Sequence, residues 1–162
     1  MKSVLAVDPG THSTGWARFE GGTMVAAGVA LGGTGAQPAR VVATARAVEL
    51  ANGSPTGLDE LVVEYPQVHK YGSAAKADPD DLLALALVAG AVLQTYPDAR
   101  ARLVRPAQWK GQVPKAVMGR RVMEHLTPPE RGVVDAVAMA HKPDHNMLDA
   151  IGIGLWHLGR LK

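Results

Sequence analysis

The stretch Ser3-Val4-Leu5-Ala6-Val7-Asp8-Pro9-Gly10 decides how this chain begins to fold. A short, nearly all-apolar run leads to a single carboxylate, which predicts a buried strand over residues 3–8 that carries Asp8 at its tip. The Pro-Gly pair then favours a turn. Two further strand patterns follow over residues 14–20 and 23–31, separated by the hairpin signal Gly21-Gly22. The first three strands are therefore predicted to form an antiparallel meander.

The same design returns at Leu61-Val62-Val63-Glu64, an apolar strand that again ends on one carboxylate. A helix is predicted before it, over residues 38–51, and a long, buried helix after it, over residues 79–96. A short strand is predicted over residues 102–105. Because helical crossovers join parallel strands and hairpins join antiparallel ones, we predict an α/β fold. It has a mixed five-stranded sheet, three strands antiparallel plus two parallel, with helices on both faces.

The C-terminal third is predicted to be helical apart from a basic loop over residues 106–114. The helices expected there span residues 115–126, 129–141 and 146–161. The earlier apolar run Leu82–Leu93 fits either an internal helix or one shared between two subunits, and composition does not distinguish these alternatives.

Length and composition limit the kind of protein this can be. The chain has 162 residues and a mass of 17.0 kDa, which predicts a single domain over residues 1–162. It has no cysteine, which excludes disulfides, thiolate zinc sites and cysteine nucleophiles. The longest apolar run is well short of the about 20 residues that span a membrane. With no signal peptide pattern at Met1, we expect a cytoplasmic protein without a membrane partner.

Positive charge gathers in one part of the sequence. The net charge is only +2, yet residues 100–125 contain seven lysines and arginines and one acid. Such a stretch suggests a surface for phosphate-rich ligands, although a solvated helix face is the commoner cause.

Three carboxylates occupy positions where a sheet and a helix can bring them together. Asp8 and Glu64 end strands, and Asp149 is predicted on the first turn of the last helix, where Asn146 shares its face. Clustered carboxylates repel one another unless a cation intervenes, and oxygen ligands suit Mg²⁺ or Mn²⁺. Two such ions, roughly 3.5 to 4 Å apart, can activate water against a phosphodiester. Taken alone, an acid at a strand end is more commonly a turn residue or a helix cap, and an acid in the first turn of a helix more commonly faces the helix dipole.

These residues resemble one known family over nearly the whole chain. The stretch from Val4 to Thr11, with Thr14-Gly15, resembles the opening strand and hairpin of RuvC-type Holliday-junction resolvases. Leu61–Glu64 resembles the strand with that family's catalytic glutamate, and Asp149-Ala150 its closing helix. Trp109-Lys110-Gly111 and Asn146-x-x-Asp149-Ala150 look most like phage-type members.

The resemblance implies a ribonuclease H-like homodimer in a bacterial cell or a phage-infected host. The reaction it implies is hydrolysis of two symmetric phosphodiesters in a four-way DNA junction, with two Mg²⁺ ions per active site and Mn²⁺ as a substitute. Asp8, Glu64 and Asp149 match metal-ligand positions. Family members commonly carry Asp or His three residues before the last Asp, where this chain has Asn146, preceded by His145. Both residues stay candidates for the fourth ligand.

The resemblance also suggests DNA contacts on two segments. The first follows the catalytic glutamate and contains His69, Lys70, Tyr71 and Lys76, of which Tyr71 suits stacking on an unpaired base. The second is the basic stretch, whose candidates are Arg105, Lys110, Lys115, Arg120 and Arg121. Exposed lysines are most often only solvated, and Tyr71 equally fits simple packing.

Other functions share some of these features. The segment from Asp8 to Gly15 also resembles the phosphate loop of actin-like ATPases and sugar kinases, but those proteins need two such lobes and this chain has one. Another ribonuclease H-like nuclease, such as one of the YqgF-type RNA-processing group, shares the strand-end acids and acts on RNA, hybrids or branched DNA. A non-catalytic nucleic-acid-binding module needs the basic stretch but has no need of the acids.

Overall fold

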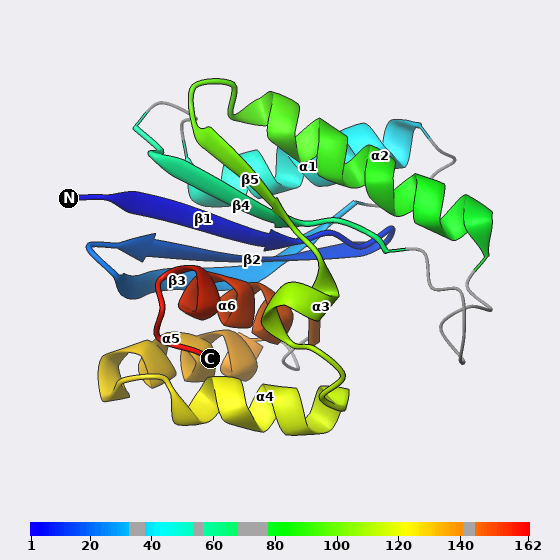
Figure 1. The fold of residues 1–162 in the computed structure, drawn as a ribbon. Helices are drawn as coiled ribbons and strands as arrows, with labels where there is room; N and C mark the ends of the chain where they lie inside the picture. Colours follow the sequence, from blue (N-terminus) through cyan, green and yellow to red (C-terminus); the bar gives the residue numbers. More distant parts are fainter. Residues whose placement is uncertain (33–37, 54–56, 68–77, 141–144) are drawn as a thin grey trace.

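A computed structural model describes residues 1–32, 38–53, 57–67, 78–140 and 145–162, and its centre is one five-stranded sheet (Figure 1). The strand order is β3-β2-β1-β4-β5. The β1, β2 and β3 strands are antiparallel neighbours, whereas β4 runs parallel to β1 and β5 runs parallel to β4. The predicted mixed sheet is therefore confirmed. The strands are β1 (Ser3–Asp8), β2 (Ser13–Glu20), β3 (Thr23–Leu31), β4 (Glu60–Glu64) and β5 (Arg100–Val104).

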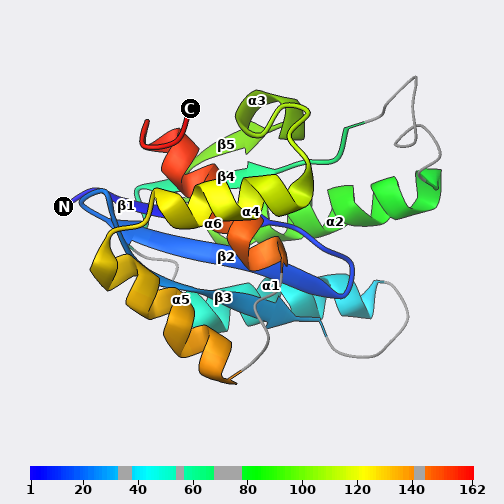
Figure 2. The same cartoon turned by 90° about the horizontal axis from the view of Figure 1, so that it is seen from below.

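Helices cover both faces of the sheet, as predicted. The first face carries α1 and α2, and the opposite face, seen in Figure 2, carries the C-terminal helices. The helices are α1 (Ala39–Asn52), α2 (Pro79–Thr95), α3 (Pro106–Trp109), α4 (Lys115–Glu124), α5 (Pro128–Ala140) and α6 (His145–His157). No helix in the described part of the chain is both long and apolar enough to cross a bilayer.

The central strand supplies both halves of the core. Because side chains alternate across a strand, Leu5 and Val7 pack with α1 and α2, while Val4 and Ala6 pack with α6. All four side chains are almost fully buried. This double burial explains why the opening stretch reads as a continuous apolar run rather than an alternating one.

Three helix predictions need correction. The segment after β5, predicted to be a basic loop, contains the short helix α3, which has Pro106 at its first position. The Gln108 side chain caps this helix, because its Oε1 accepts a hydrogen bond from the Arg105 N–H at 2.8 Å. The last helix ends at His157, earlier than predicted, because Gly159 adopts a φ of 72° and the next N–H groups turn back to the Leu155 carbonyl.

The third correction concerns α2, which is not buried all round. Ala84, Val88 and Val92 form its buried stripe, but Leu83 and Leu87 on the outer face are 64% and 54% exposed. Because one layer of helices covers this face of the sheet, α2 has a solvent side that its apolar sequence does not reveal.

The α6 helix lies unusually close to the sheet because glycines make room for it. A Cβ on Gly15 would overlap the Asn146 carbonyl at the start of α6, and a Cβ on Gly154 would overlap the Phe19 ring. Gly15 pairs with Asp8 across the sheet. The start of α6 therefore rests on β2 directly beside the tip of β1.

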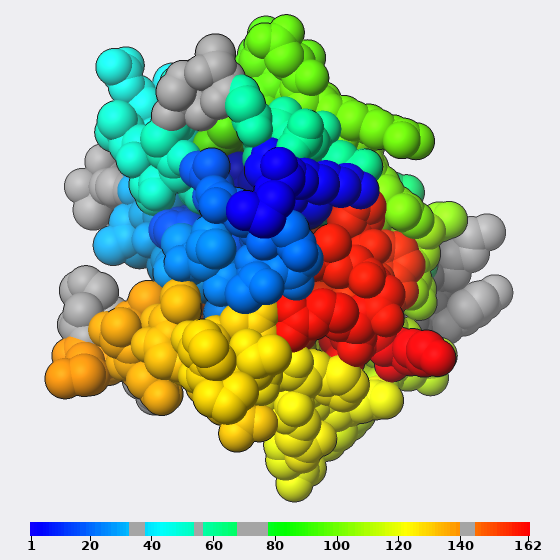
Figure 3. All heavy atoms as spheres, turned by 90° about the vertical axis from the view of Figure 1, so that its left-hand side faces the viewer, coloured from blue at the N-terminus to red at the C-terminus, as the bar shows by residue number. Residues whose placement is uncertain are grey.

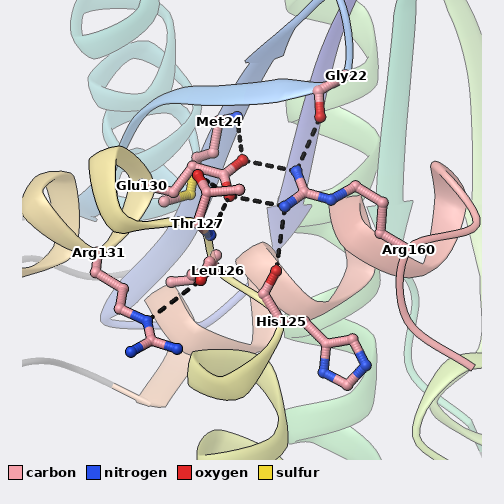
Figure 4. A network of polar contacts seen from close by, with 8 residues as sticks. All are labelled: Gly22, Met24, His125, Leu126, Thr127, Glu130, Arg131 and Arg160. Carbon is pink, nitrogen blue, oxygen red and sulfur yellow. Dashed lines mark hydrogen bonds and ion pairs between the residues drawn. The ribbon is translucent and has the colours of Figure 1, made fainter.

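At the other end of the sheet, the buried Glu130 holds three segments together (Figure 4). It accepts hydrogen bonds from the Met24 and Thr127 N–H groups at 2.8 Å and from the Arg160 guanidinium at 2.6 and 2.7 Å. The same guanidinium donates to the Gly22 and His125 carbonyls. Figure 3 shows the C-terminal residues at this end, between the strands and the α4–α5 region.

We expect Glu130→Gln to destabilise the fold by on the order of 3 kcal/mol, because it leaves the Arg160 charge without its buried partner. Burial alone would raise the pKa of Glu130, but hydrogen bonds from Arg160, Met24 and Thr127 outweigh it and lower the pKa from 4.5 to about 2. The ionised form therefore stabilises the wild type above pH 4.5, and this contribution is lost as the pH falls toward 2. Denaturant titrations at neutral and acidic pH measure both effects.

The matched control is Asp135→Asn on the exposed side of the same helix, which should change the free energy of unfolding little. Equal stability losses in the two variants at neutral pH would contradict the role assigned to Glu130.

Candidate active site

The two strand-end acids lie side by side. Val7 pairs with Val63 in the parallel β1–β4 ladder, so the next residues, Asp8 and Glu64, leave neighbouring strands at the same edge of the sheet. Both line one pocket of about 400 Å³. The structure thus brings these two predicted residues together.

The third acid reaches the same pocket from α6. Asp149 is only 5% exposed and Asp8 only 8%, so two of the three carboxylates are almost fully buried. Since α6 begins at His145, Asp149 lies on its second turn, one turn later than the sequence suggested. It reaches the strand tips because Gly15 lets the helix rest on the sheet.

The carboxylates disturb one another electrostatically. Burial raises the pKa of Asp8 well above its usual range, and the negative charges of Glu64 and Asp149 raise it further. Burial also raises the pKa of Glu64, against the opposing effect of Lys110 and Trp109. Concentrated negative charge at a buried site is the electrostatic setting in which a cation binds.

Lys110 supplies positive charge inside the pocket. Its Nζ lies 2.9 Å from Asp149 Oδ2 and 3.7 Å from Glu64 Oε2. Burial lowers the pKa of Lys110, but Glu64, Asp149 and Asp8 outweigh it, and the net pKa is raised. In the part of the chain that is described, no three acidic or imidazole groups surround one point as a ready-made ion site. The ammonium lies between two acids instead.

Trp109 holds the glutamate in place. Its Nε1 donates to Glu64 Oε2 at 2.5 Å, and the ring is 4% exposed. Gly152 of α6 makes room for this ring, since a Cβ there would overlap it. Sequence reasoning noted Trp109 only through the family resemblance and gave it no role. The sequence does place a tryptophan directly before Lys110 and a glycine three residues after Asp149, and this pair could have indicated a ring packed against the last helix.

The structure separates the two candidates for the fourth ligand. Asn146 lines the acid pocket, and its Nδ2 donates to the Ser13 carbonyl at 2.8 Å and to Ser13 Oγ at 3.1 Å. His145 lines a different hollow, between α4 and α6. The turn between β1 and β2 also lines the acid pocket, through His12 among others, which sequence reasoning did not single out.

The candidate DNA contacts fall into three groups. His69, Lys70, Tyr71 and Lys76 lie outside the described residues. Lys110 and Lys115 line the acid pocket, and Lys115 also lines the hollow beside it. Arg105 is exposed and is the N-cap residue of α3. Arg120 is exposed and lines the hollow between α4 and α6, and Arg121 is half-buried on α4.

The chain resembles known proteins in its fold rather than in its sequence. No family model matches the sequence, and no curated protein matches it. Among solved structures, the chain is similar to Thermus thermophilus RuvC in complex with a Holliday junction substrate, with 17% identity and a TM-score of 0.59. A second Thermus thermophilus RuvC structure gives 19% identity and a TM-score of 0.56. Each comparison covers 99% of this chain and 98% of the other. The chain therefore has the RuvC-like, ribonuclease H-like fold across its length.

Proposed function

We propose that this protein is a structure-selective DNA endonuclease that resolves four-way junctions by hydrolysing symmetric phosphodiesters. The observation that carries the proposal is the meeting of Asp8, Glu64 and Asp149 in one pocket, beside lysines that suit phosphate. The similar RuvC structure that holds a Holliday junction substrate supports the choice of substrate. The phage-type resemblance remains a prediction from Trp109-Lys110 and Asn146.

The donor atoms of the pocket fit a hard divalent cation. Three carboxylates and one amide oxygen are ligands that Mg²⁺ and Mn²⁺ prefer. The pKa of Asp8 is raised by burial and then by the negative charges of Glu64 and Asp149, and a bound cation would offset both effects. Asp8, Glu64 and Asp149 would hold Mg²⁺, or Mn²⁺ in its place, with Asn146 preferred over His145 as the further ligand because it lines this pocket. Two such ions per site would activate water and stabilise the leaving oxygen of a phosphodiester.

The protein's own groups position the reactants. Trp109 fixes the orientation of the Glu64 carboxylate, and neighbours of this kind commonly set ligand geometry. The Lys110 ammonium lowers the repulsion among the acids and is placed to contact a phosphate oxygen. Lys115, exposed at the rim, suits a flanking phosphate. Two buried carboxylates are costly for a module that only binds nucleic acid, and this favours catalysis.

We expect the purified protein to make paired nicks at symmetric positions in a labelled four-way junction with Mg²⁺ or Mn²⁺, and none with chelator. Asp8→Asn should lower the cleavage rate on the order of 1000-fold, because it removes the charge of a metal ligand, while leaving junction binding intact. Denaturing gels and a mobility-shift assay measure the two properties.

The control variant is Asp98→Asn, an exposed acid far from the pocket in sequence. Linear duplex, RNA–DNA hybrid and single strand are tested in parallel. Cleavage of hybrid or single strand alone would reassign the protein to another ribonuclease H-like nuclease, and normal cutting by Asp8→Asn would reject the site.

Trp109→Phe should lower the cleavage rate roughly 10-fold and raise the metal concentration needed for half-maximal rate, because the ring keeps its packing but Glu64 loses its N–H donor. The melting temperature should change little. The matched control is Trp156→Phe, whose ring stacks on Arg102 instead. A variant with an unchanged metal dependence would contradict a positioning role for Trp109.

We further propose that the protein acts as a homodimer. Two symmetric cuts need two acid pockets, and the described part of one chain holds one. The outer face of α2 is the surface that a second copy would cover, because Leu83 and Leu87 lie one turn apart there and both are exposed. Leu85 of the same helix lines the acid pocket, so a contact on α2 is close to the site.

The paired substitution Leu83→Gln and Leu87→Gln should convert a dimer into a monomer in light scattering and uncouple the two nicks in the junction. Leu50→Gln on α1, which is 75% exposed in the wild type, serves as the control and should leave the dimer intact. A monomeric wild type at micromolar concentration, or a dimeric double variant, would overturn this interface.

A further inference from the structure

An open groove of about 540 Å³ lies between α4 and α6, next to the acid pocket. Its floor is apolar and consists of Ala116, Gly119, Met123 and Leu148. Its rim is basic or imidazole-bearing and consists of Lys115, Arg120 and His145. No acidic side chain of the described residues lines it. The groove therefore combines an apolar surface with groups that attract phosphate.

The α4 sequence creates this groove. Met118 and Val122 point into the core, which leaves the small residues Ala116 and Gly119 together on an outer face of the helix. A Cβ on Gly119 would lie in ordinary contact with Leu148, 3.4 Å away, so a large side chain there would occupy the groove. Small residues on α4 keep the floor accessible.

The groove and the acid pocket share one lining residue. Lys115 lines both, at the first position of α4. A DNA strand whose phosphate lies among the acids would therefore pass Lys115 and reach the groove with the neighbouring nucleotide. A phosphate alone has no use for an apolar floor, whereas a base or a deoxyribose does.

We propose that this groove binds the base and sugar of one unstacked nucleotide that adjoins the scissile phosphate, while Lys115 and Arg120 contact the phosphates on its two sides. The inference rests on the proposed function and adds to it a subsite that senses local melting of the strand. The bases at a junction crossover unstack more easily than those in a duplex, so this subsite would favour the branch point over linear DNA.

The experiment measures equilibrium binding by fluorescence anisotropy, with chelator present so that no strand is cut. Labelled junctions carry a single abasic site at successive positions around the expected cleavage point. We expect one position to weaken binding by wild-type protein roughly 10-fold, since a stacked or buried base contributes about that much. Neighbouring positions should have a small effect.

Two variants that fill the groove test whether the base at the sensitive position binds in the groove. Ala116→Leu and Gly119→Leu introduce a good helix former and should keep α4 folded. Each should bind the intact junction about as weakly as the wild type binds the abasic one, with no further loss when the abasic site is added. Ala136→Leu makes the same exchange on an exposed position of α5 and should retain the full abasic effect.

The outcomes separate this inference from the proposed function. The proposed subsite is overturned if the abasic site weakens binding equally in the wild type and in both groove variants, or if it weakens binding at no position. The same series is run on a single strand of the cleavage sequence. An abasic effect that appears there alone, and that disappears in the groove variants, supports the groove and rejects junction selectivity.

Discussion

The contact between the start of α6 and Gly15 of β2 is the constraint on which the site depends. No side chain separates the helix backbone from the strand at that point, and Gly15 is the residue that pairs with Asp8. Asn146 donates hydrogen bonds to Ser13 at the same contact between helix and strand. A helix seated at ordinary side-chain distance would leave Asp149 several ångströms from the strand tips, and the three acids would not share a pocket.

Each end of the sheet contains a buried carboxylate, and the surroundings shift the pKa values of these two groups in opposite directions. At one end, Glu130 is buried but receives donors from three segments, so burial is outweighed and its pKa falls to about 2. At the other end, Asp8 is buried among like charges, and its pKa rises. The first arrangement stabilises the fold, because the Glu130 carboxylate is fully paired with the Arg160 guanidinium and two backbone N–H groups. In the second, the ammonium of Lys110 faces three carboxylates, so negative charge exceeds positive charge, which suits the proposed binding of a cation. The buried acid that stabilises the fold and the buried acids of the proposed active site thus lie at different ends of one sheet.

The sequence predicts this fold well where one strand or hairpin decides the outcome. Apolar runs that end on Asp8 and Glu64, and the Gly21-Gly22 turn, are local signals, and the sheet follows from them. What it does not predict depends on contacts between distant segments. The hydrogen bond from Trp109 to Glu64 joins residues 45 positions apart. The exposure of Leu83 depends on tertiary packing, because none of the described elements covers the outer face of α2. The choice between Asn146 and His145 likewise needs the helix phase, because adjacent residues on a helix face different pockets.

Lys110 and Lys115 come from the same charged segment but lie in different surroundings. Lys110 lies among the carboxylates, 23% exposed, and stabilises a cluster that would otherwise repel itself. Lys115 is exposed and borders two hollows, so its charge is available to a ligand that extends from one to the other. A charge count over residues 100–125 treats these lysines as equal. Their burial separates them: Lys110 belongs to the electrostatics of the acid pocket, whereas Lys115 carries an exposed charge between this pocket and the groove of α4 and α6.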